Sequence, residues 1–211
     1  MEKKTIFTIV SAALLLTAVG ILLWHFHNSS ATDNTRKHDV STSEVRKVER
    51  QVDIHIKRYE KDLFSLDTAR LSEELQRLSS VYPELLIDKN SWKDPQMLFQ
   101  LKAYITDPVI LEIYHDVMKV YPDLKDVETE LNTAMSYYLN YFPNDSLPSF
   151  YSLVPGLNTD MPTVYGYGND IFIHLDMYLG KNYKYYSQIG MPNFVSQRCE
   201  KKYLAVDCFS K

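Results

Sequence analysis

Few side chains in this sequence are spaced to bind a metal ion. The chain has six histidines and two cysteines, but it contains no H-E-x-x-H and no C-x-x-C, the spacings that bring zinc ligands together. The nearest approach to a ligand pair is His174 and Asp176, two residues apart and therefore on one face of a predicted strand. A zinc site needs at least one further protein ligand. We therefore predict no metal and no cofactor, and keep a site at His174 and Asp176 as the weaker alternative.

Other catalytic patterns are also missing. The sequence has no G-x-S-x-G elbow and no P-loop, and no serine or cysteine stands in a context that marks a nucleophile. Paired carboxylates can do acid–base chemistry, and Glu112, Asp116, Glu128 and Glu130 are candidates by type. They lie off the apolar stripes of the predicted helices, which favours a solvated face. We predict no catalytic residue, and a protein that is not an enzyme.

The cysteines and the tyrosines each allow two interpretations. Cys199 and Cys208 can form a disulfide in an oxidising compartment, and two free thiols are the equal alternative. The sixteen tyrosines include clusters at 137–141 and 183–186, which would suit a stacking surface for sugars. Half-buried rings with wet hydroxyls are the favoured interpretation.

Charge excludes one class of partner. Residues 51–211 carry sixteen Lys/Arg and twenty-two Asp/Glu, a formal charge of −6. A domain of that sign is repelled by phosphate backbones, so we expect no nucleic-acid partner.

The N-terminus carries a strong membrane signal. Residues 5–24 form an uncharged apolar run that follows Lys3 and Lys4, and twenty residues at the helical rise match the hydrocarbon thickness of a bilayer. The lysines predict a cytoplasmic N-terminus and a periplasmic C-terminal domain, in a single-pass protein of the cell membrane. A cleaved signal peptide is the alternative, with Ser29 and Ala31 as the small residues of its cleavage site.

Three regions follow from composition. Residues 1–27 are the predicted transmembrane anchor or signal, and residues 28–50 are polar, without aromatics, and read as a linker. Residues 51–211 form one predicted α+β domain, a helical block flanked by short strands. The expected elements are a strand at 52–57, helices at 68–81, 95–105, 108–121 and 124–142, and strands at 149–154, 163–167 and 171–175.

The last of these strands alternates in polarity. Ile171 and Ile173 would face the core, with Phe172, His174 and Asp176 on the opposite face. We therefore expect Phe172 and the nearby Tyr178 to be solvent-facing aromatics that contact a partner.

Five segments resemble, in order, the gliding-motility lipoproteins of the GldB type, which are cell-envelope proteins. They are RYEKDLFSLD (58–67), YPELL (82–86), DPVILEIYHDVMKVYPDLKDVETELNTAMSYYLNYFP (107–143), LVPGLNT (153–159) and DIFIHLDMYLG (170–180). The resemblance implies an envelope role in gliding with no established enzymatic activity, and a fold distantly like the zincin metallopeptidases. Where such relatives carry H-E-x-x-H, this chain has CEKKYLAVDCFSK, without either histidine.

The chain departs from the resemblance in two ways. The family's lipidated cysteine after the signal is missing, so the apolar run itself would be the anchor. The family also continues beyond the matching region, which suggests a shortened chain.

These observations favour a non-catalytic, membrane-anchored envelope protein that is associated with gliding motility and acts through contacts with other envelope or motility proteins. One alternative is a degenerate zincin-like hydrolase that uses His174, Asp176 and Asp207. The other is a periplasmic glycan-binding module that uses the tyrosines.

Overall fold

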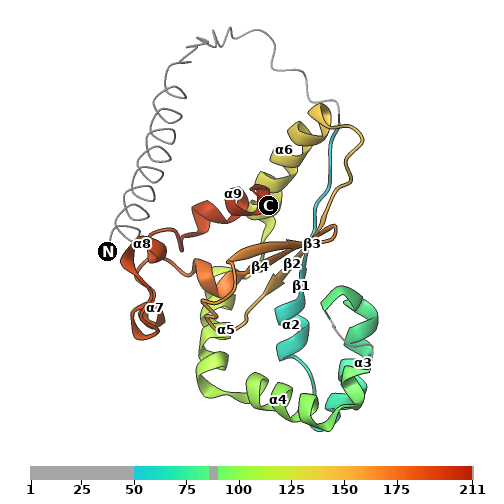
Figure 1. Cartoon of the computed structure of the whole chain (residues 1–211), viewed down its shortest axis with the longest axis vertical. Helices are drawn as coiled ribbons and strands as arrows, with labels where there is room; N and C mark the ends of the chain where they lie inside the picture. The colour runs from blue at the N-terminus through green and yellow to red at the C-terminus, as the bar shows by residue number, and fades with distance from the viewer. Residues whose placement is uncertain (1–49, 86–89, 211) are drawn as a thin grey trace, which may run out of the picture. The chain divides into compact units, whose positions relative to one another are not determined.

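The computed structural model describes residues 50–85 and 90–210, which belong to one compact unit (Figure 1). The predicted membrane segment at 5–24 and all but the last residue of the predicted linker at 28–50 lie outside the described residues. Within the described part, no helix is both long enough and apolar enough to cross a membrane. The elements are β1 (Ile56–Arg58), α2 (Tyr59–Phe64), α3 (Leu71–Val81), η1 (Pro83–Leu85), η2 (Ser91–Lys93), α4 (Pro95–Thr106), α5 (Pro108–Val120), α6 (Lys125–Tyr141), β2 (Ser149–Leu153), β3 (Val164–Tyr167), β4 (Asp170–His174), η3 (Leu175–Tyr178), α7 (Lys184–Gln188), α8 (Asn193–Ser196), η4 (Lys201–Tyr203) and α9 (Leu204–Phe209).

The strands form one mixed sheet in the order β1-β2-β4-β3. β1, β2 and β4 are parallel, and β3 is antiparallel to β4. Parallel neighbours need a crossover connection, and helices α2–α6 supply it between β1 and β2. A two-residue turn joins β3 to β4, with Gly168 at φ 61°, a conformation that glycine adopts without strain. The predicted α+β class, with a helical block and a small sheet, is confirmed.

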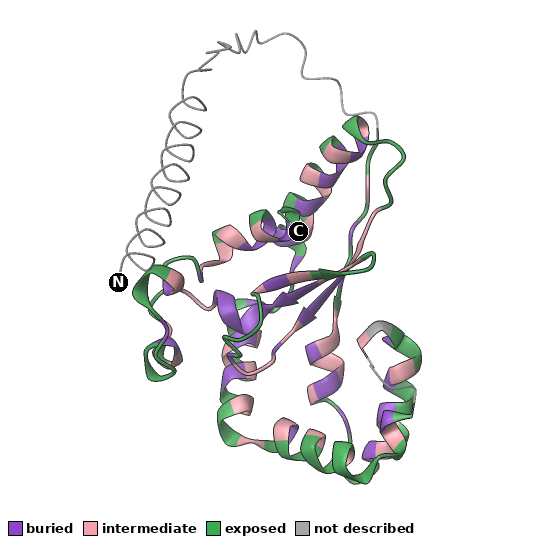
Figure 2. Cartoon of the chain, in the orientation of Figure 1, coloured by how far each residue is buried: buried purple, intermediate pink, exposed green. Residues whose placement is uncertain are grey.

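Both faces of the sheet are covered, as the colours of Figure 2 show along β2 and β4. Ile56, Phe150 and Ile173 belong to a core cluster that also includes residues of α5, α6 and α9. On the other face, Tyr151 and Phe172 pack with leucines of α2 and α3 in a second cluster. Parallel strands of this kind are buried on both sides. The expected polar face of β4 is therefore wrong.

Local signals placed the starts of α4 and α5 correctly, whereas α3 begins at Leu71 and not at the predicted residue 68. Asp107 caps α5, since its Oδ1 accepts hydrogen bonds from the amides of Val109 (2.8 Å) and Ile110 (3.0 Å), and Pro108 occupies the first helical position. Asp94 caps α4 in the same way through the Gln96 amide (2.9 Å).

Side chains of α6 cover the segment that leads into β1. Three backbone amides of this segment donate hydrogen bonds to side-chain oxygens of α6, and we call these bonds the amide ladder. They are Val52 N to Ser136 Oγ (3.3 Å), Ile54 N to Asn132 Oδ1 (2.6 Å) and Ile56 N to Glu128 Oε1 (2.8 Å). Alternate residues of an extended chain are about 6.6 Å apart and residues four apart on a helix about 6 Å, so the two spacings match. Only Ile56 and Lys57 of the predicted strand 52–57 join the sheet, since β1 spans Ile56–Arg58. Glu128 is thus half-buried and bonded, and its predicted solvated position is wrong.

Candidate functional site

Polar side chains gather where the three parallel strands end. Arg58 ends β1 and Glu60 follows it in α2, Ser152 lies in β2, and His174 ends β4 with Asp176 following it in η3. The carboxyl ends of parallel strands share one edge of a sheet, which is where open α/β sheets place their ligand sites. We call these five residues the buried polar centre.

Glu60 and Arg58 form a buried ion pair in this centre. The Glu60 side chain is fully buried, and its carboxylate accepts hydrogen bonds from Arg58 Nε and from Ser152 Oγ (2.7 Å). Arg58 Nη2 also donates to the carbonyl oxygen of Tyr121 (3.0 Å), at the C-terminal end of α5. The pair therefore joins β1, β2 and α5, and removing either partner would leave a buried charge. Sequence reasoning missed this pair, although the R-x-E spacing lies in the first segment of the family resemblance.

Asp176 holds the loop that follows β2. Its Oδ2 accepts a hydrogen bond from the Leu157 amide (2.6 Å), in a loop where Gly156 and Leu157 both have positive φ. Two family-resembling segments, LVPGLNT and DIFIHLDMYLG, therefore meet at this carboxylate. Burial raises the pKa of the Asp176 carboxyl to about 7 despite the lowering effect of nearby backbone amides. Its Oδ1 has no partner among the described residues.

His174 is buried and neutral. Neither ring nitrogen has a hydrogen-bond partner within the described part of the chain, and the Tyr165 ring packs edge-on at 5.5 Å. Burial lowers the pKa of the imidazole to about 4, so the ring carries no charge at neutral pH.

The described residues do not fit a zinc site. No group of three or more His, Cys, Asp or Glu side chains in residues 50–85 and 90–210 could hold a metal ion. Asp207 of α9 is engaged elsewhere: it accepts hydrogen bonds from Tyr178 Oη (2.9 Å) and Arg198 Nη2 (2.5 Å). β4 ends at His174 and Asp176 lies in η3, so the two do not share a strand face as predicted; no hydrogen bond joins them among the described residues, and Asp207 does not complete a ligand set with them.

The predicted contact aromatics are not accessible. Phe172 is 2% exposed and Tyr178 is 1% exposed, so the expectation that they face solvent is wrong. Phe172 stacks between Tyr151 and Tyr165 (ring centroids 5.2 and 5.0 Å), and Tyr178 lies in η3 after β4 has ended. The burial of Phe172 follows from coverage of the sheet on two sides, and Tyr178 is buried in the first core cluster.

The two cysteines are free thiols, and both are buried. Burial raises the pKa of Cys199 to about 11 and that of Cys208 to about 12. The thiols therefore stay protonated and unreactive at neutral pH.

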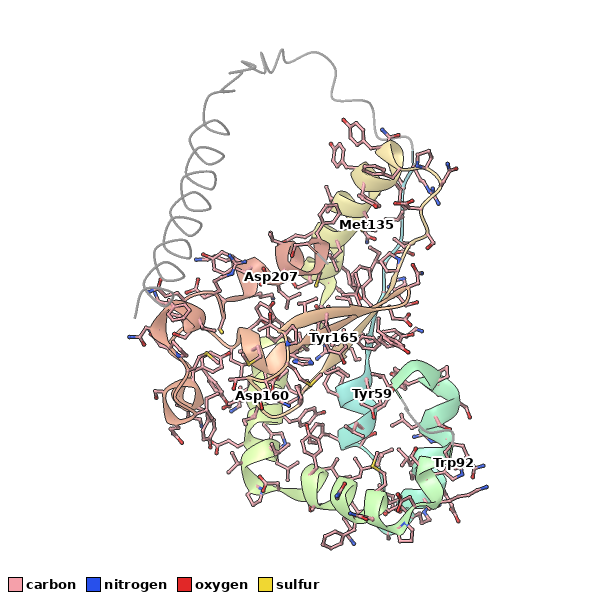
Figure 3. The ribbon with its side chains drawn as sticks, viewed as in Figure 1. Tyr59, Trp92, Met135, Asp160, Tyr165 and Asp207 are labelled. Atoms are coloured by element: carbon pink, nitrogen blue, oxygen red, sulfur yellow. The ribbon has the colours of Figure 1, made fainter. Side chains whose placement is uncertain are left out.

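Two of the surface hollows among the described residues bear on function. The first, the turn groove, has a volume of about 670 Å³ and lies among the C-terminal half of α6, the loop after it, the β3–β4 turn and α9. Figure 3 labels Met135, which lines the groove, and Asp207 on neighbouring α9. Its lining is Met135, Tyr138, Asn144, Asp145, Ser146, Pro148, Gly166, Gly168, Asn169, Asp170, Ile171, Cys208, Phe209 and Ser210.

The second hollow, the α3–α4 groove, has a volume of about 420 Å³ and is lined by residues 68–73, Leu98, Phe99 and Lys102. α4 buries only Ile105 among its twelve residues, and Phe99 is 75% exposed. Much of α4 is green in Figure 2. Phe99 is therefore a large apolar side chain that is accessible to a partner.

The structure defines an α+β protein with a small mixed sheet. The buried polar centre at the end of this sheet is largely inaccessible to solvent, whereas the turn groove and the α3–α4 groove are accessible. A family model described as gliding motility protein GldB matches residues 38–211. The chain therefore belongs to the GldB family of gliding motility proteins. Searches of curated proteins and of solved structures gave no match, so the likeness to zincins stays a prediction.

Proposed function

We propose that this chain is a non-catalytic, membrane-associated component of the cell envelope that serves gliding motility through contacts with other proteins. Membership of the GldB family supports the motility role. The apolar run at residues 5–24 supports membrane association. Burial of His174, Asp176 and Glu60, each 0% exposed, supports a role other than catalysis, because a catalytic group must reach its substrate.

The observation that carries the contact role is the exposure of Phe99 beside the α3–α4 groove. An aromatic ring buried at an interface contributes more than most side chains, so a ring that is 75% exposed is a candidate anchor. Leu98 and Leu101 of the same helix are half-buried and pack against the second core cluster, which fixes α4 on the domain. Lys102 and Arg70 border the groove and would supply a polar rim.

Phe99→Asp tests this proposal against a matched control, Phe194→Asp. Both phenylalanines are similarly exposed, at 75% and 76%, but Phe194 lies in α8 and lines a different hollow, of about 290 Å³, so the comparison tests which of the two hollows is the contact surface. We expect Phe99→Asp to reduce gliding and to release proteins that cross-link to the tagged full-length chain in membranes. Phe194→Asp should retain both.

Two outcomes would contradict the proposal. Recovery of the unmodified chain alone, under conditions that preserve other envelope complexes, would remove the contact role. Equal cross-linking and gliding in the two variants would show that the α3–α4 groove is not the contact surface.

A further inference from the structure

The lining of the turn groove has the chemistry of a site for an uncharged polar ligand. Seven of its residues offer amide, carboxylate or hydroxyl groups: Tyr138, Asn144, Asp145, Ser146, Asn169, Asp170 and Ser210. Side chains of these types accept and donate hydrogen bonds at short range, as a ligand with many hydroxyl groups requires. At about 670 Å³ the groove also falls within the size range of small-molecule sites, roughly 300–1,000 Å³.

Part of this polar surface is already held in place. Ser146 Oγ donates to Asn169 Oδ1 (2.9 Å), and Asn169 Nδ2 donates to the Leu147 carbonyl oxygen (3.0 Å). Tyr138 Oη donates to Asp145 Oδ2 (2.5 Å). These bonds connect α6, the loop after it and the β3–β4 turn, so a ligand would meet groups that are largely ordered before it binds.

Aromatic rings border the same groove. Tyr138 and Phe209 line it, and their rings meet edge-on with centroids 5.8 Å apart. Phe142 packs on Tyr138 at 4.8 Å, and Phe142 and Phe209 remain 54% and 45% exposed. Exposed ring faces beside hydrogen-bonding groups suit a ligand whose own surface alternates between C–H faces and hydroxyl edges.

The charge of the lining narrows the ligand further. It includes Asp145 and Asp170 but no lysine, arginine or histidine, so phosphate, sulfate or uronic acid groups would be repelled. A purely apolar ligand would desolvate the carboxylates and amides without satisfying them. A metal ion does not fit either, because no group of three ligands exists among the described residues.

From these observations we infer that the turn groove is a binding site for a neutral oligosaccharide. Asn144, Asp145 and Asn169 would hydrogen-bond to the sugar hydroxyls, and Phe209 would stack on a sugar ring. The inference is independent of the proposed protein contact, since the turn groove and the α3–α4 groove share no residue.

Calorimetric titration of the purified full-length chain tests the site. The probes are three neutral tetrasaccharides (cellotetraose, maltotetraose and chitotetraose), with tetragalacturonate as the acidic counterpart and tetralysine as a basic peptide. We expect at least one neutral tetrasaccharide to bind with micromolar to millimolar affinity. Tetragalacturonate and tetralysine should give no heat of binding.

Variants then assign the binding to the groove. Phe209→Ala should weaken the affinity about tenfold, the value of one aromatic contact of about 1.4 kcal/mol. Asn144→Ala should also weaken it, and since Asn144 is exposed this variant should keep the fold, which circular dichroism can check. Phe194→Ala, which removes a ring outside the groove, should bind as the unmodified chain does.

The inference would be overturned by a lack of binding for all three neutral tetrasaccharides, or by unchanged affinity in both Phe209→Ala and Asn144→Ala. Tight binding of tetralysine instead would show that the carboxylates of the groove bind basic peptides.

Discussion

Replacing Asp176 by asparagine should change how the stability of the chain depends on pH. Burial raises the pKa of this carboxyl from 3.8 to about 7, so between these values the folded chain holds a proton that the unfolded chain has released. The free energy of unfolding therefore falls as pH rises, by about 1.4 kcal/mol per pH unit from this group alone. Asp176→Asn removes that dependence.

His174 works in the opposite direction. Burial lowers the pKa of its imidazole from 6.5 to about 4, so in this range the unfolded chain holds the extra proton. Stability from this group is complete above pH 6.5 and is lost as pH falls toward 4. The pH dependences that Asp176 and His174 give to the unfolding free energy have opposite signs and cancel over most of the pH range that they share. The unmodified chain should therefore show neither of them.

Single variants should therefore reveal opposite slopes. As the pH is raised from about 4.5 to 6.5, the unfolding free energy of Asp176→Asn should rise by about 3 kcal/mol relative to that of the unmodified chain. The reason is that only the pH dependence from His174 remains. His174→Gln should lose about the same amount over that range. The double variant should again run parallel to the unmodified chain.

Urea unfolding followed by circular dichroism at several pH values across this range measures these slopes. Groups elsewhere contribute equally to all four chains and cancel in the differences. If both single variants ran parallel to the unmodified chain, the two side chains would not be buried in the protonation states that we assign to them. Slopes of the reverse sign would refute the assignment as well.

Three further outcomes are expected. Asn132→Ala should lower the free energy of unfolding in urea by about 1–3 kcal/mol, since a backbone amide of the ladder loses its acceptor; Thr133→Ala, on the exposed side of the same helix, should have less effect, and equal losses would argue against the ladder. Gly156→Ala should lower the melting temperature more than Gly180→Ala: both positions have positive φ, but only at 156 would the new Cβ meet a side chain, at 2.4 Å. Cys208 should resist iodoacetamide at pH 8 until urea is added, and rapid labelling of the native chain would show that the thiol is not buried.

Local chemistry explains which parts of the fold were predictable. The cap at Asp107, the proline after it and the turn at Gly168 depend on neighbouring residues, so their elements appear where the sequence predicts them. The pairing of β1 with β2 joins residues more than ninety positions apart, and no local pattern encodes it. α7 and α8, of five and four residues, are too short to show a helical period.

The candidate sites were harder to predict than the elements. A period of two in β4 indicates two faces but not what covers each of them, so Phe172 appeared to face solvent when α2 and α3 in fact bury it. The spacing of His174 and Asp176 predicted one strand face for both, but β4 ends at His174 and Asp176 lies in η3, and burial determines the protonation of each. The turn groove brings together α6, two loops and α9, and only tertiary structure shows it.

The amide ladder has a mechanical consequence for a protein that serves motility. The chain enters the described domain at Arg50, whose Nη1 donates to the Pro143 carbonyl oxygen (3.1 Å), and then runs antiparallel to α6 along the ladder. A tensile load applied from the N-terminal side along this direction would strain all of these bonds together. Rupture under shear requires several bonds to fail at once, whereas peeling breaks them one by one. The segment at 50–56 is therefore built to withstand a pull directed along α6 better than one directed away from it.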